Sequence, residues 1–149
     1  MLIDEARVTL VLENVMRHTI KMALKESQLK VDYWTDFEDK KVEGRLNLTV
    51  SCACDADLAL DCESMLEQAD ETTLEYGSSL GLLLSKQICK RLKGDLTVNC
   101  SKEEDDKLTI RFYMTFKCLK VPQFPKKRKI QGEEEQKSFD LHHLYNPTG

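Results

Sequence analysis

One segment of the 149-residue chain has the glycine spacing of a phosphate-binding loop. The stretch "GSSLGLLLSKQICKRLKG" at residues 77–94 begins with Gly77 and Gly81, runs into an apolar stripe and ends on Gly94. Glycines let a backbone wrap its amide groups closely around an anion. The segment could therefore bind phosphate, or it could be only a loop and a packing helix.

A second segment, "NVMRHTIKMALK" at residues 14–25, carries polar groups at helical spacing. His18 follows Asn14 by one turn, and Lys21 and Lys25 are four residues apart. Either lysine could face an anion, although such pairs more often form a solvated helix face. His18 could be a ligand or a general base, although a partly buried, hydrogen-bonded histidine is the commoner arrangement.

Cysteine is the third residue type with chemical potential, and six of them are spread over the chain. The stretch "CACDADLALDC" could offer thiolates from Cys52, Cys54 and Cys62 to zinc. Its spacing matches no strong zinc signature, so we expect no metal site. Because thiols inside cells normally stay reduced, we interpret most of the cysteines as small buried hydrophobic residues.

Composition limits the classes of protein that remain. A 17.2-kDa chain with 41% hydrophobic residues can form one domain with a real core. A formal net charge of -4 gives no general attraction to nucleic acid or to an anionic membrane. The opening "MLIDEARV" becomes charged at Asp4, and no apolar run is long enough for a membrane span. We expect an intracellular, cytoplasmic protein.

Hydrophobic periodicity predicts the elements that would position these residues. A three-and-four spacing predicts helices, and alternation predicts strands. The predicted helices cover residues 5–28, 57–70 and 80–92, with Gly94 as a left-handed cap, and the predicted strands cover 31–37, 45–52, 95–100 and 108–118. Residues 71–79 read as a loop. A sheet with one apolar face and about three helices to cover it gives an α+β two-layer sandwich.

The end of the chain has a different composition. We predict a domain over residues 1–120 and a charged tail over 121–149, flexible unless bound, whose apolar residues near the end could anchor it on a partner. The run "PKKRK" resembles a short nuclear-import signal. Its cations are Lys126, Lys127, Arg128 and Lys129.

Taken in order, these segments resemble the ATP-binding catalytic domain of sensor histidine kinases, in the superfamily that includes gyrase, the large heat-shock chaperone and mismatch-repair proteins. The resemblance spans roughly residues 4–118. It rests on Asp4 and Arg7 of an Asp-x-x-Arg element, on Asn14, His18, Thr19 and Lys21 of an N-x-x-x-N-A-x-K box, and on Gly77, Leu80, Gly81 and Leu82 of a G-x-G-L-G-L box. It implies a Bergerat-type fold, with a mixed, largely antiparallel sheet covered by helices on one face.

The resemblance also shows where the chain departs from the family pattern. His18 stands where the family's second asparagine holds magnesium, and imidazole is a poor ligand for that cation. Cys52 stands where an aspartate accepts from the adenine amino group, and Cys54 stands at the first glycine of the same box. Ser79 replaces the middle glycine of the phosphate loop.

Three hypotheses remain from the sequence. The preferred one is a pseudoenzyme that binds other protein subunits or has a structural role and needs no cofactor. Its nucleotide site would be vestigial, and it would comprise Asn14, His18, Lys21, Cys52, Cys54, Gly77, Leu80 and Gly81. The alternative is an active or nucleotide-binding catalytic domain that uses ATP with magnesium, either truncated or acting with another chain in two-component signalling. The usual dimerisation helices with a phosphoacceptor histidine are not expected here. The third is a nuclear adaptor that uses the tail.

Overall fold

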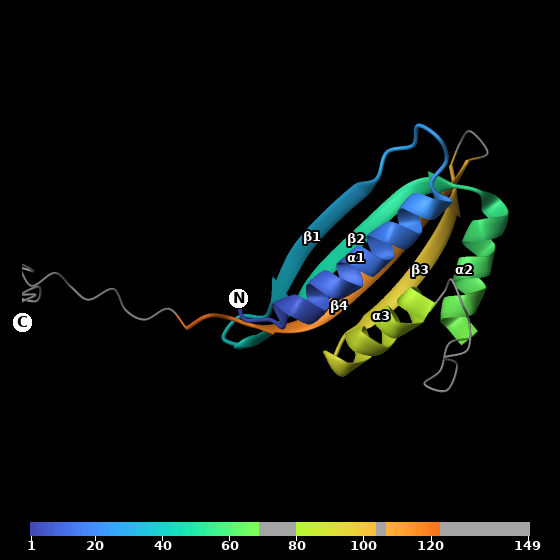
Figure 1. The fold of residues 1–149 in the computed structure, drawn as a ribbon. Helices are drawn as coiled ribbons and strands as arrows, with labels where there is room; N and C mark the ends of the chain where they lie inside the picture. The colour runs from blue at the N-terminus through green and yellow to red at the C-terminus, as the bar shows by residue number, and fades with distance from the viewer. Residues whose placement is uncertain (69–79, 104–106, 123–149) are drawn as a thin grey trace, which may run out of the picture.

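A sheet of four antiparallel strands with three helices on one face makes up the part of the chain that the structure describes (Figure 1). The structure is a computed structural model, and it describes residues 1–68, 80–103 and 107–122. The elements in chain order are α1 (Glu5–Met22), β1 (Lys30–Phe37), β2 (Glu43–Cys54), α2 (Ala56–Gln68), α3 (Leu80–Arg91), β3 (Asp95–Lys102) and β4 (Leu108–Leu119).

The strands lie in the order β1-β2-β4-β3, and every neighbouring pair is antiparallel. The alternation in β4 decides which face is buried, because successive side chains point to opposite faces of a sheet. The buried set, each at most 1% exposed, is Ile110, Phe112, Met114, Phe116 and Cys118. The helices cover this face, which confirms the predicted α+β two-layer architecture.

α1 follows its predicted pattern at the start and departs from it at the end. The Asp4 carboxylate accepts a hydrogen bond from the Arg7 amide at 3.1 Å, which caps the first turn. The predicted helix over residues 5–28 is too long, because α1 ends at Met22. Ala23 instead forms a bridge with Cys54, and the Leu24 amide donates to the Ala53 carbonyl at 3.0 Å. The backbone after Met22 therefore pairs with the end of β2 and does not continue the hydrogen bonds of the helix.

The prediction for the end of α3 was also wrong in one detail. Lys93, with φ of 59°, takes the left-handed conformation that we assigned to Gly94. The Gly94 amide then donates to the Cys89 carbonyl at 2.9 Å, which closes the helix. Glycine is needed at this position for a different reason, because a Cβ there would overlap the Thr115 carbonyl oxygen of β4.

The other predicted elements are confirmed to within about two residues at each end where the structure describes them. The predicted loop over residues 71–79 lies outside the described residues, as do the tail beyond residue 122 and the PKKRK run. None of the described helices is both long and apolar enough to cross a membrane.

Candidate functional site

Asn14 and Gly81, which lie far apart in the sequence, meet where α1 packs against α3. The Asn14 side-chain amide donates to Ser85 Oγ at 3.3 Å, and Ser85 Oγ donates to the Gly81 carbonyl at 2.7 Å. A Cβ on Gly81 would lie 3.7 Å from Asn14 Cγ, which is an ordinary contact distance. The sequence comparison placed Asn14 and Gly81 in one site, and the structure brings them together.

Ser85 was missed by the sequence reasoning. It is fully buried on α3, one turn after Gly81, between apolar neighbours such as Leu82 and Cys89. The available signal was a hydroxyl on an otherwise apolar helix face, because a buried hydroxyl needs a hydrogen-bond partner. Its partners here are the Asn14 amide and a carbonyl of its own helix.

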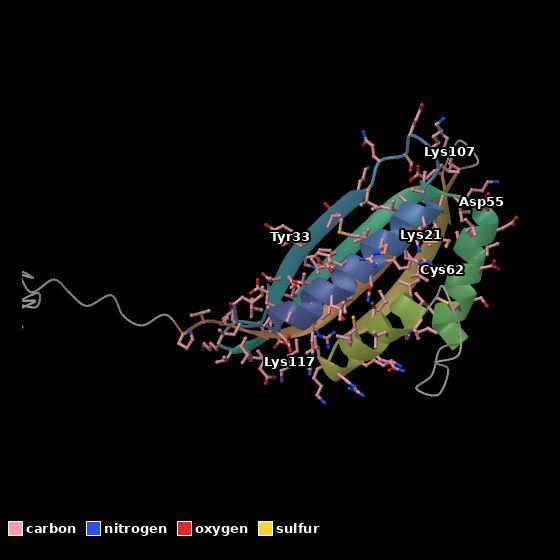
Figure 2. The ribbon with its side chains drawn as sticks, in the orientation of Figure 1. Lys21, Tyr33, Asp55, Cys62, Lys107 and Lys117 are labelled. Carbon is pink, nitrogen blue, oxygen red and sulfur yellow. The ribbon has the colours of Figure 1, made fainter. Side chains whose placement is uncertain are left out.

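His18 and Lys21 lie further along α1. His18 is half-buried, and its pKa is lowered from the ordinary value, first by burial and then by the nearby positive charge of Lys21. The imidazole is therefore neutral at pH 7. Lys21 is exposed in the last turn, and Figure 2 shows it at the end of the fold that also carries Asp55 and Lys107. The lysine is accessible to an anion, whereas the histidine offers a neutral nitrogen.

Cys52 and Cys54 occupy the end of β2, beneath the last turns of α1, and are 3% and 2% exposed. The Cys52 thiol donates to the Thr19 carbonyl of α1 at 3.8 Å, and the Cys54 thiol donates to the Leu108 carbonyl at 3.6 Å. Burial raises the pKa of Cys52, and burial together with neighbouring Cys52 raises that of Cys54 to about 11. Both groups are neutral thiols that pack against backbone oxygens.

Comparison with known proteins adds the fold relationship. No protein-family model matches the sequence, and no curated protein matches it. A mycobacterial sensor histidine kinase, MprB, matches in structure with a TM-score of 0.50 and 14% sequence identity, over 78% of this chain and 76% of that one. This chain has the fold of a histidine kinase catalytic domain. A second match, to the catalytic domain of histidine kinase ThkA, has 18% identity, covers 74% of this chain and 67% of that one, and has a TM-score of 0.39.

Within this histidine kinase fold, the carboxylate nearest to Cys52 and Cys54 is committed to another element. The Asp55 carboxylate accepts from the Asp57 amide at 2.9 Å and from the Leu58 amide at 3.4 Å. These bonds satisfy the free amides at the start of α2. Asp55 therefore caps a helix.

Cys62 and Cys100 lie near Cys54, between α2 and the sheet of the histidine kinase fold. Burial and the neighbouring thiols raise the pKa of Cys62 to about 12 and that of Cys100 to about 11. The Cys100 thiol donates to the Ala59 carbonyl of α2 at 3.5 Å, and Figure 2 labels Cys62 on α2. Among the described residues, no group of three or more His, Cys, Asp or Glu side chains is arranged to hold a metal ion.

A second feature that the sequence did not reveal connects α2 to α3. The Lys86 ammonium donates to the Leu66 carbonyl in the last turn of α2 at 3.0 Å. A cation at a helix C-terminus is stabilising, because it neutralises the partial negative charge of the free carbonyls.

The residues predicted for the glycine-rich loop are described only in part. Leu80, the first residue of α3, is 44% exposed, and Gly77 and Ser79 lie outside the described residues.

Proposed function

We propose that this chain is a pseudoenzyme: a histidine-kinase-like ATPase fold that does not turn over ATP and acts as a protein-binding or structural module, as a subunit of a larger assembly. The observation that carries this proposal is the buried thiol of Cys52, at the position where the resemblance to the family requires an adenine-binding carboxylate. The proposal assigns no cofactor to the chain.

Cys52 cannot replace that carboxylate as the hydrogen-bond acceptor for adenine. Adenine presents an amino group, which needs an acceptor, and an ionised carboxylate is an acceptor with two oxygens. The Cys52 thiol is neutral, is 3% exposed and already donates to Thr19. A bound base would have to displace this packing, and it would gain only a weak acceptor in return.

The residues of α1 fit magnesium and phosphate poorly as well. His18 presents a neutral imidazole to a cation that prefers oxygen, and the NH2 group of Asn14 is held by Ser85, so Asn14 could offer only its carbonyl oxygen. The Asn14 side chain supports the contact between α1 and α3 as it stands. The residues present therefore do not fit a magnesium nucleotide, and no catalytic step follows from them.

A second candidate function is a nucleotide-binding catalytic domain of a sensor histidine kinase, either truncated or acting with another chain. Two observations favour it: the fold is that of such a domain, and Lys21 is exposed where it could meet a phosphate. On this hypothesis, the thiols at Cys52 and Cys54 would be tolerated within a working site.

Thermal unfolding separates the two functions. The full chain is heated with and without magnesium and several millimolar of a non-hydrolysable ATP analogue, beside Lys21→Ala and the matched control Lys25→Ala, which removes an exposed lysine four residues away. We expect no shift in Tm for any of the three proteins. Ligand at a hundredfold its Kd would add ~2.7 kcal/mol to the free energy of unfolding. A shift of that size, lost in Lys21→Ala and kept in Lys25→Ala, would overturn the pseudoenzyme proposal.

For the location of the chain we propose the cytoplasm, with nuclear import through Lys126, Lys127, Arg128 and Lys129 as the alternative. Deleting residues 122–149 tests that alternative and the tail-adaptor hypothesis together. Unchanged localisation and unchanged recovery of partners after the deletion would remove both.

A further inference from the structure

The strand β1 is an open edge of the sheet. It is the outermost strand beside β2, and seven of its eight residues are exposed. Val31 is 43% exposed, Tyr33 is 76% exposed and Trp34 is 44% exposed. Figure 1 shows α1 over the inner strands, α2 and α3 on the side of β3, and no labelled helix beside β1, and Figure 2 places Tyr33 at this margin.

The opposite edge strand, β3, is covered by helices. α2 and α3 both pack against it, and the Cys100 thiol of β3 donates to a carbonyl of α2 at 3.5 Å. Leu96 of β3 is fully buried. The helix layer is therefore displaced toward β3, which leaves β1 as the accessible edge.

Native proteins usually protect such an edge with a proline, a bulge, a very short strand or charged side chains. β1 has no proline, bulge or shortening, and its charges are Lys30, Asp32 and Asp36, which are of both signs. It pairs with β2 over eight consecutive residues without interruption, from Lys30 opposite Ser51 to Phe37 opposite Gly44. Its sequence, KVDYWTDF, contains neither proline nor glycine, and its aromatic and β-branched residues favour strand pairing. A regular edge of this length is a template for another strand whose charges complement its own.

We propose that β1 pairs antiparallel with β1 of a second copy of this chain, so that two sheets join into one across a twofold axis. With that axis at Tyr33, each residue lies opposite one that points to the same face of the sheet. Lys30 then lies opposite Asp36 of the second copy, and because of the symmetry this contact occurs twice. Val31 lies opposite Thr35, and Tyr33 lies opposite its own copy. The opposite charges at the two ends of β1 therefore face each other when the strand pairs with its own copy.

The same charges disfavour the neighbouring registers. A shift that keeps each side chain on its face moves the pairing by two positions. One such shift sets Asp32 opposite Asp36, and the other sets Asp32 opposite its own copy. Like charges directly opposite each other in a strand pair are destabilising. The register centred on Tyr33 is therefore selected by both attraction and repulsion.

Lys30 and Asp36 are both available for this contact. The Asp36 carboxylate accepts from the Asn47 amide at 2.7 Å, which holds it on the outer face of the sheet, and a carboxylate can accept further hydrogen bonds. Lys30 is exposed and has no ion-pair partner among the described residues. Lys30 lines a polar hollow that also carries charges of both signs, among them Lys25, Lys107, Glu26 and Glu103.

A charge-exchange experiment tests the partner and the register together. Sedimentation equilibrium of the full chain over a concentration series should show a monomer–dimer equilibrium with a Kd on the order of micromolar. Lys30→Asp and Asp36→Lys each place like charges opposite each other twice, so each should raise the Kd by about tenfold or more. An equimolar mixture of the two variants restores both attractive contacts, and it should form heterodimers with a Kd near that of the parent chain. Lys90→Asp on α3 and Asp39→Lys, which change exposed charges away from β1, should leave the Kd unchanged.

A cross-link provides a test that does not depend on Asp36, whose replacement also removes its bond to Asn47. The introduced thiol of Tyr33→Cys would face its own copy and should form a disulfide-linked dimer in oxidised glutathione. The thiol introduced by Thr35→Cys lies on the same face, away from the twofold axis, and should link much more slowly. The parent chain, with its six native cysteines, gives the background.

A chain that stays monomeric up to several hundred micromolar overturns the proposal. So does a dimer that neither charge variant weakens, because another surface would then hold it together. A mixture that fails to recover association, together with equal cross-linking at positions 33 and 35, rules out this register. None of these outcomes involves nucleotide, so failure of this inference and failure of the pseudoenzyme proposal are distinguishable.

Discussion

Beneath α1, the side chains of Asn14, Thr19 and Cys52 all find hydrogen-bond partners within the protein. Along β1, by contrast, aromatic and β-branched side chains are exposed and one edge of the strand has no neighbouring strand among the described residues. The first region contains the residues that the sequence motifs assign to a nucleotide site. The second is a sheet edge with no counterpart in the residue motifs.

This difference bears on where the chain can interact. A ligand entering beneath α1 would have to break internal hydrogen bonds and displace buried thiols, and both steps cost free energy. A strand added to β1 would satisfy backbone groups that now face water and would cover exposed apolar surface. The physical chemistry therefore favours a partner at the edge over a ligand beneath α1.

Replacing Cys52 by aspartate should give the largest effect. Cys52→Asp places a carboxylate beneath α1, beside the Thr19 carbonyl, which is also an acceptor. We expect a loss of about 3–5 kcal/mol in the free energy of unfolding at pH 8, measured by urea denaturation.

The pH dependence of that loss gives a second readout. Burial raises the pKa of a carboxyl above its value in the unfolded chain, so the neutral form is tolerated at low pH and the penalty grows as the pH rises. The variant should therefore lose less stability at pH 5 than at pH 8, whereas Cys52→Ser should lose about 1–2 kcal/mol at both. A cost for Cys52→Asp below about 1 kcal/mol, independent of pH, would mean that this position is open to water and that the contrast with β1 is false.

The contact between Asn14 and Ser85 should give an intermediate effect. Asn14→Ala removes the amide that donates to Ser85 Oγ, and we expect a loss of about 1 kcal/mol in the free energy of unfolding. A double-mutant cycle with Ser85→Ala should show a coupling energy of about 0.5 kcal/mol or more, because the two side chains share the bond. Strict additivity would show that Asn14 is not holding α1 to α3.

A smaller effect is expected from His18, in a direction set by its lowered pKa. Between its folded and unfolded pKa values, the unfolded chain binds more protons, so the contribution of His18 to stability is complete above pH 6.5 and decreases as the pH falls below it. His18→Gln should flatten this part of the stability curve. A proton NMR titration, in which the variant identifies the His18 signal, should give a midpoint below that of a solvent-exposed histidine. A midpoint above 6.5 would mean that the imidazole is not buried as described.

The contrast also separates what the sequence could predict from what it could not. Periodicity was sufficient to place the strands, because Phe112 and its alternating neighbours leave one choice of face, and it located the helices but not the end of α1 at Met22. The motifs were sufficient to predict that Asn14 and Gly81 lie close together. Neither could show that Ser85 engages the Asn14 amide, because that bond depends on how α1 and α3 pack. Nor could alternation along β1 show that Tyr33 lies beyond the helix layer. Alternation assigns a side chain to one face of the sheet, but it does not show whether a helix covers that face.

The smallest effect should come from the bare edge itself. Tyr33 is 76% exposed, so Tyr33→Thr, which keeps a residue suited to a strand, should change the free energy of unfolding of the monomer by no more than about 0.5 kcal/mol. The measurement is urea denaturation well below the dimer Kd, with Leu48→Thr on the opposing position of β2 as the control. Leu48 is 8% exposed and pairs with Tyr33 in register, so its replacement should cost several times more. Equal costs at the two positions would show that Tyr33 is supported within the monomer, and β1 would then not be an edge that is free for another chain.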